Sequence, residues 1–283
     1  MNINSSTKTI CLLGHPVKHS FSPTIHNYLF EKYLNNNIYV CFDVNEDNLE
    51  NCVHGIKALD IKGCNVTIPH KVNIIKYLDS IDDNAKLIGA VNTIENKGGI
   101  LKGYNTDGIG FVKSILDKGY DIKNKKVMII GAGGSCRSIA IELASKGVKS
   151  IEIRNRSLDN ANKIVDVINK SFNAEANCSK DSIDSCCLMN IDILINTTPI
   201  GMENDLCPID TNIVIDKDLL VCDIVYKPKE TVFLKWAKKN NLEIIYGIDM
   251  LINQALEAFK IWTNIKPCYE DFEYIKKLYE NNI

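Results

Sequence analysis

The sequence lacks the features of membrane-spanning, disordered and nucleic-acid-binding chains. No apolar run approaches the ~20 residues needed to cross a bilayer. Hydrophobic residues make up 45% of the chain and charged residues 24%, the ordinary mixture of a soluble globular protein. The net charge of -2 leaves no basic field to attract a nucleic acid or an anionic membrane. We therefore expect a small-molecule partner, with no nucleic acid and no membrane.

The cysteines lack any regular framework. Their number, 11, is odd, and no C-x-x-C pair occurs. The N-terminal segment MNINSSTKTI has neither the basic region nor the apolar stretch of a signal peptide. We expect a cytoplasmic chain whose thiols serve as small core residues. The five histidines show no convincing ligand spacing, so no metal is predicted.

Arginine is scarce, because only three of the 33 basic residues are arginine. These three, Arg137, Arg154 and Arg156, fall within one stretch of about 20 residues. Their clustering indicates a local function for that stretch, which is taken up below.

The sequence does contain an α/β pattern, which occurs in two separate series. The length of 283 residues suits two domains. Short runs rich in β-branched residues alternate with segments of helical period. In the first third these runs predict strands at 10–13, 38–42 and 63–68, with helices near 23–34 and 46–58. From about residue 126 they predict strands at 127–130, 150–153, 191–195 and 219–223, with helices near 135–146, 157–170 and 229–239.

Between the two series, residues 91–105 predict a hairpin with a Gly98-Gly99 turn, followed by a linking helix from about Thr106 to Lys118. From Asp249 onward the pattern predicts two helices without a strand to cover, which we expect to return to the first domain. The predicted domains are residues 1–106 completed by helices in 247–283, and residues 107–246. The fold class is α/β: an open, mostly parallel sheet and a Rossmann-type sheet, separated by a cleft.

The segment KKVMIIGAGGSCRSIAIELASKG predicts a buried strand, a glycine-rich turn and an amphipathic helix, which is the context of a dinucleotide site. Gly131 permits the tight turn and Gly133 lets the backbone approach a pyrophosphate, which the helix N-terminus attracts. The third position of the fingerprint holds Cys136, which is small enough for close helix packing. The candidate cofactor residues of this turn are Gly131, Ala132, Gly133, Gly134 and Ser135.

The end of the next strand distinguishes NADP from NAD. An NAD site usually places an acidic residue there for the ribose 2′-hydroxyl, whereas this chain has Arg154, Asn155, Arg156 and Ser157. Guanidinium groups suit a 2′-phosphate through forked hydrogen bonds. The sequence therefore favours NADP as the cofactor.

Several motifs of the first domain carry polar side chains at strand ends. GHPVKHSFSP predicts a helix with Ser22 as its N-cap, and Ser20 with Ser22 would form a donor-rich carboxylate site. NVTIPHK places Asn65, Thr67 and Lys71 after a strand, where open α/β sheets bind ligands. A lysine near a helix start opposes the macrodipole unless a carboxylate or a substrate compensates it.

Two more motifs follow in the same domain. AVNT presents the amide of Asn92, and NTDG places Asp107 at the start of the linking helix. An aspartate in a first helical turn is also common for purely structural reasons.

Taken together and in this order, GHPVKHSFSP, NVTIPHK, GAVNT, GYNTDG, GAGGSCR, NRS and GIDMLINQA closely resemble the shikimate dehydrogenase family over about residues 10–260. The resemblance implies that Ser20 and Ser22 hold a substrate carboxylate and that Lys71, paired with Asp107, is the proton donor and acceptor. Other implied substrate contacts are Thr67, Asn92, Tyr226 and Gln254. It implies Ile224, Tyr226, Gly247 and Met250 around the nicotinamide, with Asp83 as a further acidic position near the cofactor. One departure is Asn160, where the family often has a second basic residue.

The implied reaction is the reversible, NADPH-dependent reduction of 3-dehydroshikimate to shikimate, in the pathway to chorismate and the aromatic amino acids. Alternatives left open are an enzyme that also oxidises quinate or uses NAD, a methylenetetrahydrofolate dehydrogenase, and a regulatory NADP-binding module with a dead site. Ser22 in place of threonine favours shikimate over quinate. The expected oligomeric state is a monomer or a homodimer.

Overall fold

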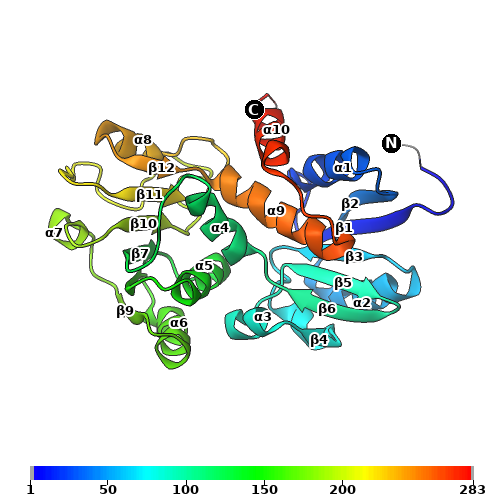
Figure 1. The fold of residues 1–283 in the computed structure, drawn as a ribbon. Helices are drawn as coiled ribbons and strands as arrows, with labels where there is room; N and C mark the ends of the chain where they lie inside the picture. Colours follow the sequence, from blue (N-terminus) through cyan, green and yellow to red (C-terminus); the bar gives the residue numbers. More distant parts are fainter. Residues whose placement is uncertain (1–2, 282–283) are drawn as a thin grey trace. The chain divides into compact units, whose positions relative to one another are not determined.

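The computed structural model describes residues 3–281 and divides them into two compact units (Figure 1). Unit 1 comprises the chain up to Thr106 together with residues from Ile252 onward, and unit 2 comprises Asp107–Leu251. The return to unit 1 comes five residues after the predicted position 247, because one continuous helix crosses the boundary. Within residues 3–281, no helix is long and apolar enough to cross a membrane.

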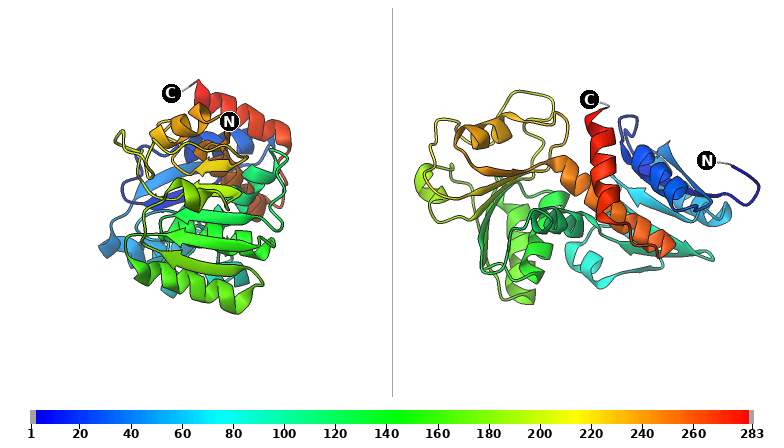
Figure 2. Two further views of the ribbon diagram at one scale, coloured as in Figure 1. Left: turned by 90° about the vertical axis from the view of Figure 1, so that its left-hand side faces the viewer. Right: turned by 45° about the horizontal axis from the view of Figure 1, so that its top comes forward.

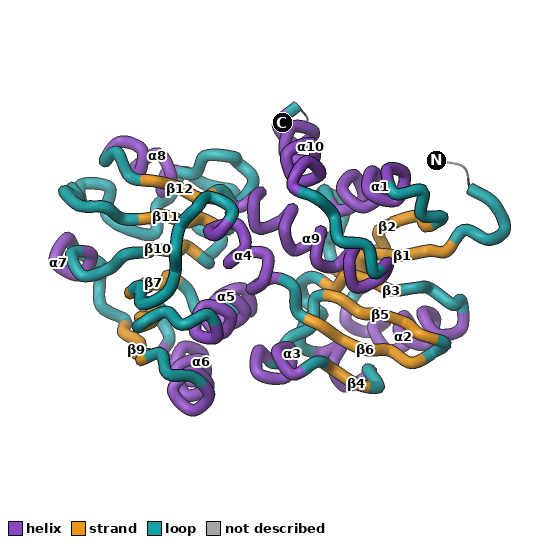
Figure 3. The backbone as a smooth tube through the Cα atoms, viewed as in Figure 1, coloured by secondary structure: helices purple, strands orange, loops and turns teal. Residues whose placement is uncertain are grey.

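Unit 1 is built on a six-stranded mixed sheet with the order β2-β1-β3-β5-β6-β4, and Figure 3 distinguishes its strands from the helices and loops by colour. Its strands are β1 (Lys8–Gly14), β2 (Asn37–Asp43), β3 (Gly63–Val66), β4 (Ser80–Ile81), β5 (Thr93–Lys97) and β6 (Ile100–Tyr104). Its helices are α1 (Ser22–Lys32), α2 (Leu49–Ala58), α3 (Asp83–Ile88) and α10 (Tyr269–Glu280), with short 3₁₀ turns η1 (Glu46–Asn48) and η2 (Asn73–Tyr77). Most of α9 (Gly247–Thr263) also belongs to this unit.

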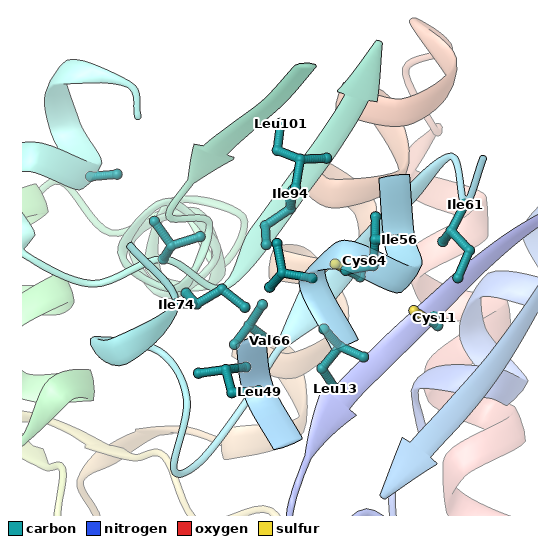
Figure 4. Close-up of a cluster of buried hydrophobic side chains, with 13 residues drawn as sticks. Cys11, Leu13, Leu49, Ile56, Ile61, Cys64, Val66, Ile74, Ile94 and Leu101 are labelled. Atoms are coloured by element: carbon teal, nitrogen blue, oxygen red, sulfur yellow. The ribbon is translucent and has the colours of Figure 1, made fainter. Parts of the chain in front are cut away.

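One face of this sheet carries an apolar core formed with α2 and η2. Figure 4 shows the side chains of this cluster, among them Cys11, Leu13, Leu49, Ile56, Cys64, Val66, Ile74, Ile94 and Leu101. The alternate residues of the strands face α1 and α9, where the rings of Phe30 and Phe259 lie 5.5 Å apart. Helices therefore cover both faces, as a largely parallel sheet requires.

Unit 2 is an all-parallel sheet with the order β12-β11-β10-β7-β8-β9, and the left view of Figure 2 shows its strands side by side. The strands are β7 (Lys126–Ile130), β8 (Ser150–Arg154), β9 (Glu175–Ser179), β10 (Ile193–Asn196), β11 (Leu220–Asp223) and β12 (Glu243–Ile245). The helices are α4 (Asp107–Leu116), α5 (Gly134–Ser145), α6 (Leu158–Ser171), α7 (Ser185–Leu188) and α8 (Val232–Lys239). This strand order is that of the doubly wound dinucleotide-binding fold, so the predicted fold class is confirmed.

The predicted third strand ends two residues early, at Val66 instead of residue 68. The reason is Pro69, which has no N–H to continue a ladder and restricts the residue before it. The predicted set of strands also lacks β4, β9 and β12. β4 and β12 have only two and three residues, and β9 (EANCS) is a polar edge strand without a β-branched run.

Candidate active site

The polar motifs of unit 1 meet at one edge of its sheet. β1, β2 and β3 are parallel, so their carboxyl ends share that edge. β5 runs antiparallel, and its first residue, Thr93, pairs with Asn65 of β3 and with Tyr104, the last residue of β6. The sheet therefore brings together four segments that are far apart in sequence. They are the segments after β1 and after β3, the one before β5 and the one after β6.

The two serines of the first motif lie at the start of α1. The Ser20 hydroxyl oxygen accepts a hydrogen bond from the Ser22 N–H at 3.2 Å, and Ser22 is buried. The prediction of Ser22 as N-cap is wrong by one residue, because the helix begins at Ser22 and Phe21 takes the N-cap position. Ser20 instead supplies the side-chain acceptor for this first turn, so the two hydroxyls lie together at a helix N-terminus.

Lys71 follows β3 in a turn that backbone hydrogen bonds hold closely. The His70 N–H donates to the Thr67 carbonyl at 2.9 Å, and the Lys71 carbonyl accepts from the Val91 N–H at 2.8 Å. The fully buried His70 ring lies 2.6 Å from the Val44 carbonyl through Nε2. These bonds join the turn that carries Lys71 to the end of β3 and to the segment before β5, while the Lys71 side chain is only partly buried.

Asn92 and Gln254 are joined by a buried network. The Asn92 Oδ1 accepts from the Thr106 N–H at 2.8 Å, and the Asn92 Nδ2 lies 3.0 Å from the Thr106 hydroxyl. That hydroxyl lies 3.5 Å from the Gln254 Oε1 on α9. The structure therefore brings the amides of Asn92 and Gln254 to the same edge as Asn65.

Asp107 follows Thr106 directly and opens α4 as the first residue of unit 2. Its carboxylate is buried and lies in the first turn, where the helix macrodipole favours negative charge. Gly108 allows α4 to lie close to α5, because a Cβ there would be 2.4 Å from the Ser138 carbonyl. Close packing of two helices therefore fixes the position of this carboxylate within unit 2.

The glycine turn of unit 2 has the geometry of a diphosphate cradle. Gly131 has φ +104°, and a Cβ at this position would lie 2.8 Å from the Thr197 hydroxyl. Around Gly133 and Gly134, by contrast, a Cβ would meet no heavy atom within 4 Å among the described residues. α5 begins at Gly134 without a side-chain cap, so the N–H groups of its first turn are presented to a ligand.

This turn also lies at the point where the strand order reverses. β10 pairs with β7 in register, and the Thr197 N–H and hydroxyl after β10 both bond the Ile130 carbonyl, at 2.9 and 2.7 Å. In doubly wound sheets the crevice at this reversal is where nucleotides bind. The residues present therefore fit a dinucleotide.

The two arginines after β8 have different environments. Arg154 is only 10% exposed, and its guanidinium lies 2.6 Å from the Glu152 carboxylate and 3.3 Å from the Asp181 carbonyl. Arg156 is exposed, next to Asn155, whose amide donates to the Ser157 carbonyl at 2.6 Å. Arg154 thus holds neighbouring strands together, and Arg156 is the arginine presented to solvent.

The remaining predicted cofactor residues of unit 2 lie after β11 and β12. Gly247 packs so closely that a Cβ would be 2.5 Å from the carbonyls of Ile224 and Val225. Tyr226 and Met250 are therefore carried on two segments that touch. Burial raises the pKa of the Tyr226 hydroxyl.

Asp223, the last residue of β11, holds the segment that follows this strand. Its Oδ2 accepts from the Thr231 hydroxyl at 2.6 Å, and its Oδ1 accepts from the Asn196 amide and the Val225 N–H, both at 3.0 Å. Burial raises the pKa of this carboxyl to about 6, and the three hydrogen bonds oppose the rise. Sequence reasoning missed Asp223, because an acidic residue ending a buried strand has no distinctive pattern.

Asp83 stands apart from the other predicted cofactor residues, because it belongs to unit 1. It lies in the first turn of α3 with its side chain 95% exposed and 2.8 Å from Lys86. The Lys86 hydrogen bond lowers the pKa of this carboxyl. Its role toward a cofactor stays a prediction.

Three segments of the chain match known protein families. Residues 12–94 match the Shikimate dehydrogenase substrate binding domain, residues 111–204 match the Shikimate / quinate 5-dehydrogenase family, and residues 247–272 match the Shikimate 5′-dehydrogenase C-terminal domain. These matches follow the order of the motifs along the chain and cover both units.

Full-length relatives agree. A shikimate dehydrogenase (NADP(+)) of Caldanaerobacter subterraneus is 47% identical over 279 residues, covering 98% of each chain. The solved shikimate 5-dehydrogenase of Listeria monocytogenes in complex with shikimate and NAD is 35% identical, with a TM-score of 0.90 and 98% coverage of each chain. A solved 5-ketofructose reductase of Gluconobacter is 30% identical, with a TM-score of 0.87 over 97% of this chain and 100% of its own. This chain belongs to the shikimate dehydrogenase family.

Proposed function

We propose that this protein is an NADP-dependent shikimate dehydrogenase, which reversibly reduces 3-dehydroshikimate to shikimate in the pathway to chorismate. The observation that carries the proposal is the full-length similarity to shikimate dehydrogenases together with the retention of Lys71 and Asp107. The 5-ketofructose reductase has the same fold, so the substrate follows from the side chains of the site and not from the fold.

The edge of unit 1 supplies groups for each part of the substrate. The paired hydroxyls of Ser20 and Ser22 at the start of α1 bind the carboxylate, with support from the helix dipole. Thr67, Asn92 and Gln254 bind the ring hydroxyls. Each binding group is held by backbone or network hydrogen bonds, so little ordering is needed when the substrate arrives.

Lys71 carries the proton transfer. Bound NADPH supplies the hydride to the ketone carbon. As negative charge develops on the ketone oxygen, the Lys71 ammonium stabilises that charge and then donates a proton from Nζ, which completes the new hydroxyl. In the oxidation direction the neutral amine accepts the proton of the same hydroxyl. General acid catalysis of this kind contributes about 10²- to 10⁴-fold.

Asp107 orients Lys71 and binds a substrate hydroxyl. It is covalently joined to Thr106, which belongs to the network that holds Asn92, so its backbone starts from the substrate edge of unit 1. Unit 1 supplies the residues that bind the substrate, and unit 2 supplies those that would hold the nicotinamide.

The cofactor is NADP. Gly131, Ala132, Gly133, Gly134 and Ser135 would hold its diphosphate. The turn of Arg154, Asn155, Arg156 and Ser157 would hold its 2′-phosphate, with Arg156 as the exposed guanidinium and Arg154 supporting the turn through Glu152 and Asp181. Ile224, Tyr226, Gly247 and Met250 surround the nicotinamide, and Asp83 lies nearby. The protein acts in the cytoplasm as a monomer or a homodimer, and the eleven unpaired cysteines suit a reducing compartment.

A panel of substrates tests the proposal. The purified protein is supplied with shikimate, quinate, 5-ketofructose and methylenetetrahydrofolate, each with NADP or NAD, while NAD(P)H absorbance is followed. The highest kcat/KM is expected for shikimate with NADP. Equal use of quinate or of NAD would replace the proposal by the broader quinate/shikimate activity. Tight binding of shikimate and NADP without turnover would favour a regulatory module.

A further inference from the structure

Beneath the predicted substrate side chains lies a buried tyrosine that the proposed mechanism does not use. Tyr39 belongs to β2, is 2% exposed, and its hydroxyl donates to the Asn65 Oδ1 at 2.7 Å. A buried tyrosine hydroxyl generally has a partner, and here the partner is a residue of the substrate edge.

The Asn65 amide has no hydrogen left for a ligand. Its Nδ2 donates one bond to the Asn92 carbonyl at 3.1 Å and another to the Thr93 hydroxyl at 3.0 Å. Because an amide nitrogen carries two hydrogens, both are used within the protein. Asn65 therefore orients Asn92 and Thr93 and does not donate a hydrogen bond to the substrate.

From Asn65 the hydrogen bonds continue through Thr93 and Asn92 to Thr106, which lies next to Gln254 of α9. The Thr93 hydroxyl donates to the Asn92 Oδ1 at 3.0 Å, and the Asn92 Nδ2 donates to the Thr106 hydroxyl at 3.0 Å. The Thr106 hydroxyl in turn faces the Gln254 Oε1 at 3.5 Å. The Thr106 N–H also donates to the Asn92 Oδ1 at 2.8 Å, and the Thr106 hydroxyl has this same oxygen as a second acceptor at 3.2 Å. The Tyr39 hydroxyl and the Thr106 backbone therefore together set which way the Asn65 and Asn92 amides are turned.

The Tyr39 ring is itself held in place by aromatic packing. The His26 ring stacks on it with centroids 4.4 Å apart, and the Trp262 ring lies 5.1 Å from His26. Trp262 fits only because residue 63 is glycine, where a Cβ would lie 2.5 Å from the indole nitrogen. The Trp262 indole N–H donates to the Ile94 carbonyl at 2.9 Å, which attaches this group of aromatic rings to the sheet.

We infer that Tyr39 is a positioning residue for the substrate: through Asn65 and Thr93 it fixes the amide of Asn92 and the partner of Gln254 in the orientation that binds the ring hydroxyls. The inference deepens the proposed function and rests on it. Without the hydroxyl, the Asn65 Oδ1 would lose its buried donor and the amide could turn over, which would disturb each later group in the chain.

The test compares Tyr39→Phe with the wild-type protein. Shikimate binding is measured by titration calorimetry without cofactor, and KM and kcat are measured with NADP. We expect the Kd and KM for shikimate to rise about 5- to 30-fold, which is the usual effect of leaving one buried polar partner unsatisfied, and the KM for NADP to stay unchanged. Thr93→Val removes the next hydroxyl in the series of hydrogen bonds. It is also expected to raise the Kd and KM for shikimate while the KM for NADP stays unchanged. The double variant is expected to bind shikimate no more weakly than either single variant.

The matched control is Tyr33→Phe, which removes a hydroxyl that bonds Asp271 at 2.6 Å elsewhere in unit 1. It is expected to lower stability without altering shikimate binding. The inference is wrong if Tyr39→Phe binds shikimate like the wild type, if Tyr33→Phe weakens binding equally, or if the double variant is additive. Should Tyr39→Phe fail to fold, Thr93→Val decides. A wild-type protein without shikimate binding or turnover would refute the proposed function before any variant is compared, and this inference with it.

Discussion

Lys71 is the residue on which the proposed chemistry depends. Lys71→Ala and Asp107→Ala are expected to lose about 10²- to 10⁴-fold in kcat, because general acid catalysis and the orientation of the acid are removed. Circular dichroism and the unfolding midpoint should stay close to those of the wild type. The measurement is NADPH-linked turnover of the purified variants. Lys76→Ala, which changes a lysine in η2 of the same unit, is the matched control and should retain activity; near-normal turnover of Lys71→Ala would reject the assignment.

His26 makes the stability of the protein depend on pH. Burial lowers the pKa of its imidazole to about 3, and Asn65 partly opposes this shift. As pH falls below about 6.5, the unfolded chain gains a proton that the folded chain does not bind until about pH 3, so the free energy of unfolding falls by about 1.4 kcal/mol per pH unit. Urea unfolding between pH 7 and 4.5 measures this slope.

His26→Leu should remove that part of the slope, whereas His54→Leu, at an exposed histidine, should retain it. A wild-type slope that His26→Leu leaves unchanged would show that another group titrates. The fully buried ring also explains why a histidine one helical turn after Ser22 has a packing role and not a ligand role.

The residues that sequence reasoning missed share one property: their partners are distant in sequence. Tyr39 resembles an ordinary core residue of an alternating strand, and nothing local shows that its hydroxyl meets Asn65, 26 residues later. Thr93 and Thr106 belong to the recognised motifs AVNT and NTDG, but their hydrogen bonds follow from the pairing of β5 with β3 and β6. The sequence motifs therefore identify which polar side chains the site contains. The hydrogen bonds between these side chains can be assigned only when the register of the strands is known.

At the level of elements, the turn after β8 is the segment that we propose determines the preference for NADP over NAD. Arg156 is exposed at this turn, so Arg156→Ala is expected to weaken NADP binding by about 10- to 100-fold and to leave NAD binding nearly unchanged. Titration of the protein with each cofactor measures both constants.

Arg154→Ala is the matched control, because the Arg154 guanidinium is bonded to Glu152 and Asp181 and joins β8 to the segment after β9. It should lower the unfolding midpoint more than it alters cofactor preference. The opposite result, loss of NADP preference in Arg154→Ala alone, would mean that Arg154 is the residue that binds the 2′-phosphate.

Most long elements were predictable because a single pattern specified each of them. The strands rich in isoleucine and valine and the helices of clear period were found within a few residues of their bounds, as in β7 and α5. β9, β12 and the short α3 depend on neighbours to cover them, so their own sequences carry little signal. The N-cap of α1 is Phe21 and not the predicted Ser22, because the helix begins one residue earlier than the pattern of a serine before Pro23 indicates.

At the scale of the whole molecule, substrate and cofactor are expected to stabilise different units. Shikimate alone should slow amide hydrogen exchange in residues 15–22 and 67–71 of unit 1, and NADP alone should slow it in residues 131–137 and 155–157 of unit 2. Each ligand orders the loops that it touches, and exchange measured by mass spectrometry resolves these segments. Protection of unit 2 by shikimate without cofactor would contradict this division of roles.

A crystal structure of the ternary complex with shikimate and NADP tests the central claim most directly. The account predicts the Lys71 Nζ within about 3.2 Å of the hydroxyl that is oxidised, the carboxylate on Ser20 and Ser22, and the cofactor diphosphate on Gly131–Ser135. A complex with Lys71 remote from the substrate, or with the cofactor bound away from the glycine turn, would contradict it.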